Sequence, residues 1–186
     1  MKKTSAIICA YNNESTIKDI VSTVCDSFFA EVIVINDGST DKTDFILKQI
    51  NNFYNFKYIV LAENKAKGFA IATGIENTSA EIIIFIDANL SNLQDRHLAQ
   101  LIMPLQYKEA DMVLGQTSET LIDYKMSPCK SLIAEMSFFK KDILPILEDF
   151  KCSKLRVETL LNFHYQYHQK RVKYVMLEGL KIAHKS

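Results

Sequence analysis

Short runs of β-branched and other apolar residues alternate with longer stretches of helical periodicity through residues 1–115, and this alternation constrains the fold most strongly. The runs predicted to form strands are Thr4–Ala10, Glu31–Asn36, Phe56–Leu61, Glu81–Ile86 and Asp111–Gly115. The stretches predicted to form helices are Glu14–Ser27, Asp41–Asn51, Lys67–Glu76 and Asp95–Tyr107. Strands that alternate with helices pair in parallel through right-handed crossovers. The sequence therefore predicts an α/β fold with a mostly parallel central sheet flanked by helices.

The regular alternation ends after residue 115. A polar stretch, Gln116–Pro128, is predicted to be a loop able to move, and an amphipathic segment follows at Leu132–Phe139. Two helices are expected at Asp142–Phe150 and Lys154–His168, and a strand at Arg171–Leu177. Because the sequence contains no repeat, low-complexity segment or linker, we expect one domain over residues 1–186.

Composition excludes some classes of partner. Lys plus Arg and Asp plus Glu each total 22, so no global basic field points to nucleic acid. The four cysteines form no Cys-x-x-Cys pair, and the amino terminus does not resemble a signal peptide, so we expect reduced thiols in the cytoplasm. No apolar run approaches the roughly 20 residues that span a bilayer. Peripheral contact with the inner face of the membrane stays open.

The motif Asn36-Asp37-Gly38-Ser39-Thr40-Asp41 directly follows the apolar run EVIVI. Asp37 at the end of a strand is placed to accept hydrogen bonds from a ribose or a base, and Gly38 allows a tight turn. Ser39 or Asp41 can cap the next helix, whose amino end favours a bound phosphate. A capped turn without a ligand explains the motif equally well.

Two further motifs follow predicted strands. Ala10-Tyr11-Asn12-Asn13-Glu14 offers amides and a carboxylate that can bind the uracil or ribose of a nucleotide. In the stretch NKAKG, which ends at Gly68, glycine lets the backbone approach a ligand, and Lys67 can pair with a diphosphate. Taken singly, a helix cap at Asn13 and a solvated lysine pair are the simpler explanations.

Asp87-Ala88-Asn89 follows the run EIIIFI. A carboxylate that leaves an apolar strand is costly to bury unpaired, so we expect Asp87 to face a cleft. Two oxygen ligands one residue apart can hold Mg²⁺ or Mn²⁺ against a diphosphate and neutralise charge on a departing nucleoside diphosphate. Asn89 supplies only a neutral amide oxygen, and a plain turn capped by Asp87 is the alternative.

In this order the four motifs resemble family 2 glycosyltransferases of the GT-A fold, over roughly residues 4–115. The segments that match the family pattern are SAIICAYNNESTI, EVIVINDGSTDKT, NKAKGFAIATGI and EIIIFIDANL. The resemblance implies that residues 1–115 bind the nucleotide-sugar and that residues 116–186 form the acceptor side. It also implies roles for individual residues. Tyr11, Glu14 and Asp37 would contact the nucleoside, Lys67 would lie near the diphosphate, and Asp87 with position 89 would bind the metal. Ala10 and Asp87 would also belong to the nucleotide-sugar site.

The carboxy-terminal part resembles small bacterial members related to glucosyl-3-phosphoglycerate synthases and polyprenyl-phosphate sugar transferases. IAEMSFFKKDIL occupies the place of an acceptor motif, and LRVETLLNFHYQ matches a Gly-Tyr-x-x-Glu segment. These matches nominate Glu135 and Glu158 as the carboxylate that takes the proton from the acceptor hydroxyl. Glu158 also fits a first-turn residue that interacts with the helix dipole. His184 is a candidate metal ligand, although a frayed terminus is an alternative.

The sequence departs from the family pattern at three places: Asn89 replaces an Asp, Ala66 replaces a Gly, and the acceptor motif has Ala134 and Met136 in place of Gly and Arg. The resemblance implies transfer of a hexose from a UDP- or GDP-sugar to a phosphorylated or lipid-phosphate acceptor. The departures leave open a catalytically silent nucleotide-sugar-binding domain with a regulatory or scaffolding role. A nucleotidyltransferase is disfavoured because the AYNNES segment lacks a glycine-rich loop with a basic residue.

Overall fold

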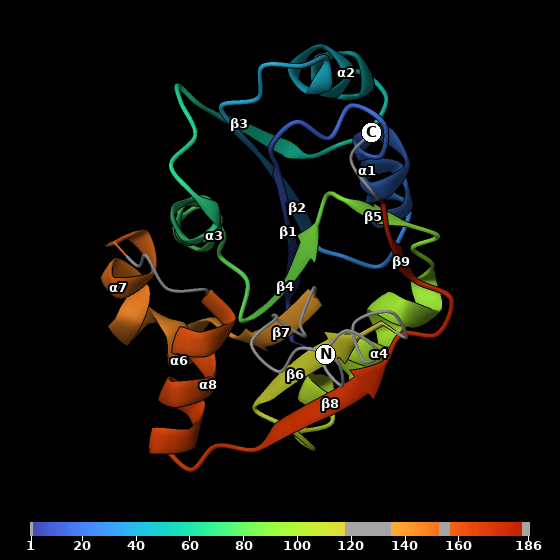
Figure 1. The fold of residues 1–186 in the computed structure, drawn as a ribbon. Coiled ribbons are helices and arrows are strands. Elements are labelled where there is room, and N and C mark those ends of the chain that lie inside the picture. Colours follow the sequence, from blue (N-terminus) through green and yellow to red (C-terminus); the bar gives the residue numbers. More distant parts are fainter. Residues whose placement is uncertain (1, 118–134, 153–156, 184–186) are drawn as a thin grey trace, which may run out of the picture.

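The computed structural model describes residues 2–117, 135–152 and 157–183, without the side chain of Glu158. A seven-stranded sheet with strand order β3-β2-β1-β4-β7-β6-β8 runs through its centre (Figure 1). The strands are β1 (Thr4–Ala10), β2 (Glu31–Asp37), β3 (Lys57–Leu61), β4 (Ile82–Asp87), β6 (Met112–Gln116), β7 (Glu135–Phe139) and β8 (Val172–Met176). Strands β1 to β4 are parallel to one another, and β6 is parallel to β8. The predicted α/β fold with a mostly parallel sheet is confirmed.

Strand β7 is the exception, because it pairs antiparallel with both β4 and β6. The sequence predicted only an amphipathic segment over Leu132–Phe139. Met136 and Phe138 belong to one apolar core, whereas Ser137 on the other face donates a hydrogen bond of 2.6 Å to the carbonyl of Leu101. This alternation is that of a strand buried on both faces.

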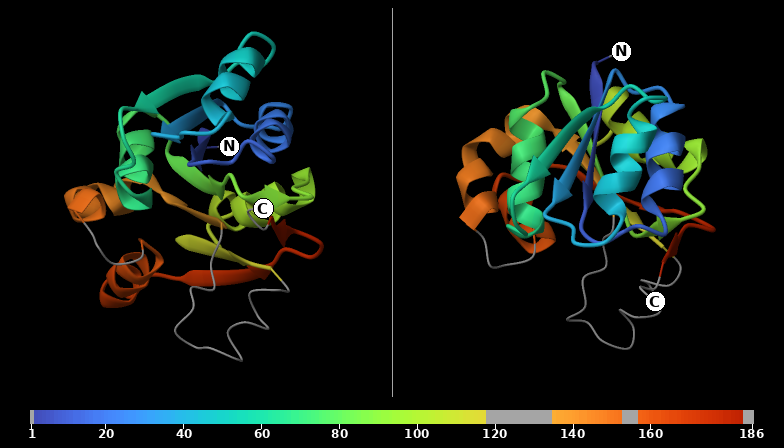
Figure 2. Two further views of the ribbon diagram at one scale, coloured as in Figure 1. Left: turned by 45° about the horizontal axis from the view of Figure 1, so that its top comes forward. Right: turned by 90° about the horizontal axis from the view of Figure 1, so that it is seen from above.

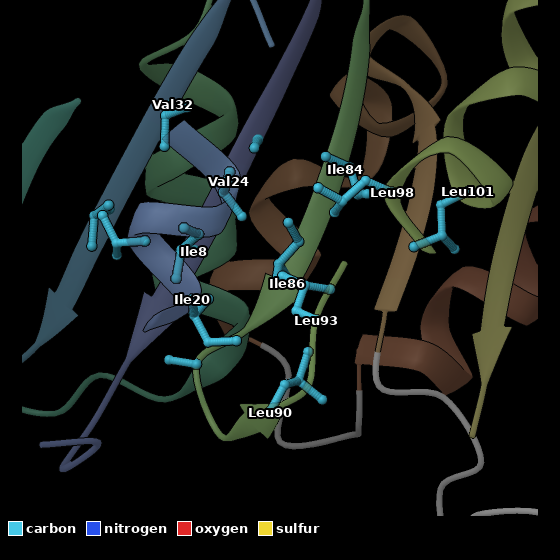
Figure 3. Close-up of a cluster of buried hydrophobic side chains, with 14 of the residues drawn as sticks. Ile8, Ile20, Val24, Val32, Ile84, Ile86, Leu90, Leu93, Leu98 and Leu101 are labelled. Carbon is cyan, nitrogen blue, oxygen red and sulfur yellow. The ribbon is translucent and has the colours of Figure 1, made fainter. Parts of the chain in front are cut away.

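Helices cover both faces of the sheet (Figures 1 and 2). Helices α1 (Ile17–Cys25), α2 (Thr43–Ile50) and α4 (Asp95–Gln106) contribute to one core. Helices α3 (Lys67–Glu76), α7 (Leu147–Cys152) and α8 (Val157–Tyr167) contribute to the other. Figure 3 shows the first core, where Ile8 and Ile84 of the sheet lie near Val24 of α1 and Leu98 of α4.

The predicted helix over Asp142–Phe150 is broken in the structure. The segment consists of α6 (Lys140–Ile143), a 3₁₀ turn over Leu144–Ile146 and α7. Pro145 lies in that turn, and its ring removes a backbone donor that a continuous helix would need. No helix in the described parts of the chain is long and apolar enough to cross a membrane.

A second, two-stranded sheet was not predicted. Strand β5 (Leu90–Ser91) pairs antiparallel with β9 (Lys181–Ile182). Beyond this pair, the backbone amide of Ala183 donates a 2.6 Å hydrogen bond to the carbonyl of Asn89. The carboxy-terminal segment is thereby held beside the turn that follows β4.

The amino ends of the strands carry a polar cluster around Glu31. Its carboxylate accepts hydrogen bonds from Lys3, Thr78 and Ser79. Burial by itself would raise the pKa of Glu31, but these hydrogen bonds outweigh it and lower the pKa to about 2. The cluster lies at the opposite end of the sheet from the motifs and serves the stability of the fold.

Candidate functional site

The carboxyl ends of β1, β2 and β4 lie side by side. In the strand register, Ala10 pairs with Asn36, and Cys9 pairs with Asp87. A cleft of about 230 Å³ opens at these ends. It is lined by Cys9, Ala10, Tyr11, Asn13, Asp37, Asn64, Ala66, Lys67, Ala70, Phe85, Asp87 and Asn89. Ligands of open parallel sheets bind at this position, outside the carboxyl ends of the strands.

The turn after β2 packs directly on the loop between β3 and α3. Gly38 has a φ of +68°, and a Cβ atom there would lie 2.5 Å from the carbonyl carbon of Glu63. Asp37 is only 4% exposed, and its Oδ1 accepts a 2.8 Å hydrogen bond from the backbone amide of Lys65. Only glycine permits both this backbone conformation and this close approach. The turn therefore holds the Asp37 carboxylate beside the loop that contains Lys65.

The side chain of Asn36 forms hydrogen bonds that stabilise this turn. Its Oδ1 accepts a hydrogen bond of 2.9 Å from the amide of Ser39, and its Nδ2 donates one of 3.1 Å to the Tyr58 hydroxyl. That hydroxyl donates in turn to Asp44 at 2.7 Å. Burial and the hydrogen bond to Asp44 both raise the pKa of Tyr58. The chain of hydrogen bonds holds the turn in one conformation.

Side-chain hydrogen bonds join the loop after β1 to the start of α2. Asn12 Oδ1 accepts a hydrogen bond of 2.8 Å from the amide of Thr40, and the amide of Asn13 donates one of 2.8 Å to Thr43 Oγ1. The Glu14 carboxylate accepts a hydrogen bond of 2.9 Å from the amide of Lys42. Glu14 therefore faces the amino end of α2 and does not line the cleft, so its expected contact with the nucleoside stays a prediction.

Lys67 and Asp87 face each other across the cleft. The Lys67 Nζ lies 3.4 Å from Asp87 Oδ2 and 4.8 Å from the centre of the Phe85 ring. The two side chains are 35% and 28% exposed, so both remain accessible to a ligand. Burial and the negative charge of Asp87 raise the pKa of the neighbouring Cys9 thiol. Cys9 is therefore a neutral part of the cleft wall at physiological pH.

The residue before Lys67 has an unusual backbone conformation. Ala66 has φ +78° and ψ 155°, a region that non-glycine residues rarely adopt. The resembled family has glycine at this position, and the backbone gives the physical reason. Alanine at this position therefore introduces strain at the start of α3.

Three acceptor oxygens near Asp87 have no hydrogen-bond donor. They are Asn89 Oδ1 and both carboxylate oxygens of Glu135, which is fully buried. Burial and the charge of Asp87 raise the pKa of Glu135 well above its usual value, against smaller lowering effects of Lys67 and the Asp87 backbone amide. In the parts of the chain that the structure describes, no three His, Cys, Asp or Glu side chains group together. Unpartnered oxygen acceptors beside a carboxylate nevertheless fit a hard divalent cation.

The structure thus brings together in one cleft most of the residues predicted to bind the donor and metal: Ala10, Tyr11, Asp37, Lys67, Asp87 and Asn89. Glu135 lies next to this set but is not in the cleft wall. Glu158 lies in α8, but its side chain is outside the described residues, as are His184 and most of the predicted loop Gln116–Pro128.

Two residues of the cleft wall, Cys9 and Phe85, were not predicted from the sequence to belong to the site. Cys9 and Phe85 belong to apolar runs and carry no signal of a site. Only the register of β1 beside β4 shows that Cys9 lies next to Asp87. Asn64, which also lines the cleft, opens the predicted motif NKAKG, although no role was assigned to it.

Comparison with known proteins agrees with this geometry. The family model described as Glycosyl transferase family 2 matches residues 5–142. The chain belongs to glycosyl transferase family 2. Curated relatives within the family include the poly-β-1,6-N-acetyl-D-glucosamine synthases of Staphylococcus epidermidis, 33% identical over 87 residues, and of Staphylococcus aureus strain COL, 33% identical over 91 residues. These matches cover 46% and 48% of this chain but only 21% and 22% of the relatives.

Solved structures of the GT-A fold resemble the chain over its whole length. Glucosyl-3-phosphoglycerate synthase from Mycobacterium tuberculosis, in complex with phosphoglyceric acid, superposes with a TM-score of 0.75 at 18% identity. The same enzyme with Mn²⁺, uridine diphosphate and glucosyl-3-phosphoglycerate superposes with a TM-score of 0.70 at 17% identity. Each match covers 100% of this chain and 73% of the other. At this identity the likeness establishes the shared GT-A fold.

Proposed function

We propose that this family 2 glycosyltransferase chain transfers a hexose from a UDP- or GDP-sugar to a phosphorylated acceptor. One observation carries the proposal: Asp37, Lys67 and Asp87 come from three separate elements and line the same cleft. A carboxylate that accepts from a nucleoside, an ammonium group for a diphosphate and a second carboxylate for a cation are the groups that a nucleotide-sugar requires.

Binding of the donor would use groups already held in place. Asp37 uses Oδ1 for the Lys65 amide, which leaves Oδ2 for a ribose or base. Lys67 is attracted to the Asp87 carboxylate and lies over the Phe85 ring, so its ammonium group is directed into the cleft. A bound diphosphate would draw this ammonium group toward its oxygens and release Asp87 for a cation.

Asp87 and Asn89 are the cleft residues that would hold Mg²⁺ or Mn²⁺. When bound, the cation would stabilise the negative charge of the departing nucleoside diphosphate. The solved neighbours that contain Mn²⁺ or Mg²⁺ with uridine diphosphate support this assignment. Lys67 would add a second positive charge on the same diphosphate. His184 stays a predicted further ligand, since it follows the segment held beside Asn89.

Removal of the proton from the acceptor hydroxyl is predicted for Glu158. Glu135, the other nominated carboxylate, is fully buried behind the cleft wall, where the hydroxyl of a bulky acceptor molecule would not reach it. A general base must come within hydrogen-bond reach of the hydroxyl that it deprotonates. Residues 1–115 would thus bind the donor, and residues 116–186 would contribute the acceptor side.

The acceptor class is part of the proposal. The complex of the structural neighbour with phosphoglyceric acid supports a small phosphorylated acceptor. A lipid-phosphate acceptor, with peripheral contact at the inner face of the membrane, is the variant that the sequence resemblance to polyprenyl-phosphate sugar transferases supports. We propose that the protein acts in the cytoplasm. Nucleotide-sugars would be the donors there for transfer to a small phosphorylated acceptor and for transfer to a lipid phosphate.

Turnover and binding assays test the proposal. The chain is incubated with UDP-glucose, UDP-N-acetylglucosamine or GDP-mannose and Mn²⁺, with 3-phosphoglycerate or polyprenyl phosphate as the acceptor, and release of nucleoside diphosphate is measured. We expect Lys67→Gln to weaken UDP binding about tenfold or more, because a charge-assisted contact is lost. Lys65→Gln is the matched control, since its ammonium group pairs with exposed Glu63.

Three departures from the family pattern keep a second function in view, a silent nucleotide-sugar-binding domain. Tight UDP binding without turnover, in the wild type and in Asn89→Asp alike, would favour that role. Turnover by the wild type would exclude it. If no nucleotide binds and Lys67→Gln behaves like Lys65→Gln, the cleft is not a donor site and both functions fail.

A further inference from the structure

The start of β7 lies against the end of β4. In their antiparallel register Ile82 pairs with Phe139, and Phe85 pairs with Met136. The next pair along this register is Ile86 with Glu135, which puts Glu135 beside the residue that precedes Asp87. The backbone amide of Asp87 is close enough to the Glu135 carboxylate to exert a small lowering effect on its pKa. A second carboxylate is therefore available at the turn that is expected to bind the cation.

Glu135 differs from every other acidic residue in the described parts of the chain. It is 0% exposed, and both of its carboxylate oxygens lack a hydrogen-bond partner. The other buried acid with an unpartnered oxygen, Asp142, uses its second oxygen to pair with Lys170 at 2.8 Å. Burying a carboxylate without any partner is costly, so its position calls for a positively charged or proton-donating ligand.

Asn89 is the second anomaly at the same place. It stands where the family pattern has a carboxylate, and its Oδ1 is also buried without a donor. The turn after β4 therefore supplies one negative charge, from Asp87, and one neutral oxygen. Because Asp87 also pairs with Lys67, the turn alone is weakly negative and poorly suited to hold a divalent cation.

We propose that Glu135 is a ligand of the divalent cation and supplies the carboxylate that the Asp-Ala-Asn turn lacks. Asp87, Asn89 and Glu135 together offer oxygen donors that include two carboxyl groups, the donor set that Mg²⁺ and Mn²⁺ prefer. The proposal rests on the proposed function only in taking the cation to bind in this cleft. It assigns Glu135 a role different from the removal of the acceptor proton.

Binding of Mn²⁺ tests the assignment without reference to turnover. Free Mn²⁺ is titrated by its electron paramagnetic resonance signal in the presence of UDP, and circular dichroism verifies the fold of each variant. We expect Glu135→Gln to lower the affinity for Mn²⁺ at least tenfold, and Asn89→Asp in the Glu135→Gln background to restore most of it. Glu81→Gln is the matched control, because this exposed residue pairs with Lys2 near the other end of β4.

A second measurement covers the case in which Glu135→Gln does not fold. Wild-type protein labelled with ¹³C at its glutamate carboxyl groups should show ¹³C hyperfine coupling to bound Mn²⁺. Absence of that coupling, or wild-type affinity for Mn²⁺ in folded Glu135→Gln, would overturn the assignment. Unchanged affinity with lost turnover would instead identify Glu135 as the base. If the Mn²⁺ results hold but no sugar is transferred, the proposed activity fails while the ligand assignment stands.

Discussion

Replacement of Ala66 by glycine is expected to stabilise the protein, although Ala→Gly substitutions usually destabilise helical proteins. Ala66 precedes the first residue of α3 and has φ +78° and ψ 155°. Residues other than glycine in this region of conformational space carry about 1–3 kcal/mol of strain. Glycine adopts the same conformation without that strain because it has no Cβ atom.

The magnitude follows from two opposing contributions. Relief of strain favours the folded variant by about 1–3 kcal/mol, whereas glycine makes the unfolded chain more favourable by about 0.4–1 kcal/mol. The net expectation is a gain of about 1.3 kcal/mol in the free energy of unfolding, within a range of about 0–2.6 kcal/mol. For a chain of this length, each kcal/mol corresponds to a rise of roughly 2–4 °C in Tm.

Ala72→Gly provides a matched control within the same helix. Ala72 is fully buried in the interior of α3, so the substitution loses helix propensity, about 1 kcal/mol, and a buried methyl group, about another 1 kcal/mol. Urea denaturation of both variants would measure the free energies of unfolding. Opposite signs are expected. If Ala66→Gly destabilises the protein as much as Ala72→Gly does, residue 66 is unstrained and the conformational argument is refuted.

Three further predictions concern the turn after β2, the acid stability and the thiols. Gly38→Ala should lower the free energy of unfolding by about 2–5 kcal/mol, because the new Cβ atom is strained and lies 2.5 Å from the backbone of Glu63. Gly179→Ala is the control, since Gly179 also has a positive φ, +83°, but its nearest neighbour is a flexible arginine side chain 3.4 Å away, and it should cost about 1–2 kcal/mol. Equal losses of stability in urea denaturation would contradict the close approach at Gly38. The pKa of Glu31 is about 2 in the folded protein and lies below its unfolded value. Its contribution to stability is therefore present above about pH 4.5 and is lost as the pH falls toward 2. Glu31→Gln should remove roughly 1–3 kcal/mol of this acid dependence, and an unchanged pH profile of unfolding would argue against a stabilising role of Glu31. Iodoacetamide at pH 8 should modify exposed Cys152 at least about a hundredfold faster than buried Cys9, whose pKa is raised by burial and by Asp87. Similar rates for the two thiols, measured by mass spectrometry, would disprove the burial of Cys9 in the cleft wall.

The donor half of the candidate site was predictable from sequence because its signals are local. Asp37 and Asp87 each end an apolar strand, and parallel strands place such residues at one edge of the sheet. Lys67 is the first residue of α3, which begins at the same edge of the sheet. Glu14 shows the limit of this reasoning, since it belongs to a motif at the same edge but contacts the amide of Lys42. The side of a loop to which a side chain points depends on contacts with the neighbouring loop.

Glu135 shows the same limit in the second half of the chain. Its segment has the amphipathic pattern of a helix or a strand, and nothing local indicates that it enters the sheet between β4 and β6. That position, rather than the sequence around it, buries the carboxylate and brings it next to Asp87. The pairing of β5 with β9 was likewise unpredicted, since each strand has only two residues.

The order of strands and helices, the parallel sheet and the motifs at its edge can be recognised in the amino-acid sequence because they depend on periodicity and turn chemistry within short segments. The antiparallel insertion of β7, the burial of Glu135 and the return of the carboxy-terminal segment to Asn89 depend on pairing between residues far apart in the chain. Such pairing depends on which strand edges and apolar surfaces remain exposed once the rest of the chain has folded. Only the tertiary structure contains that information.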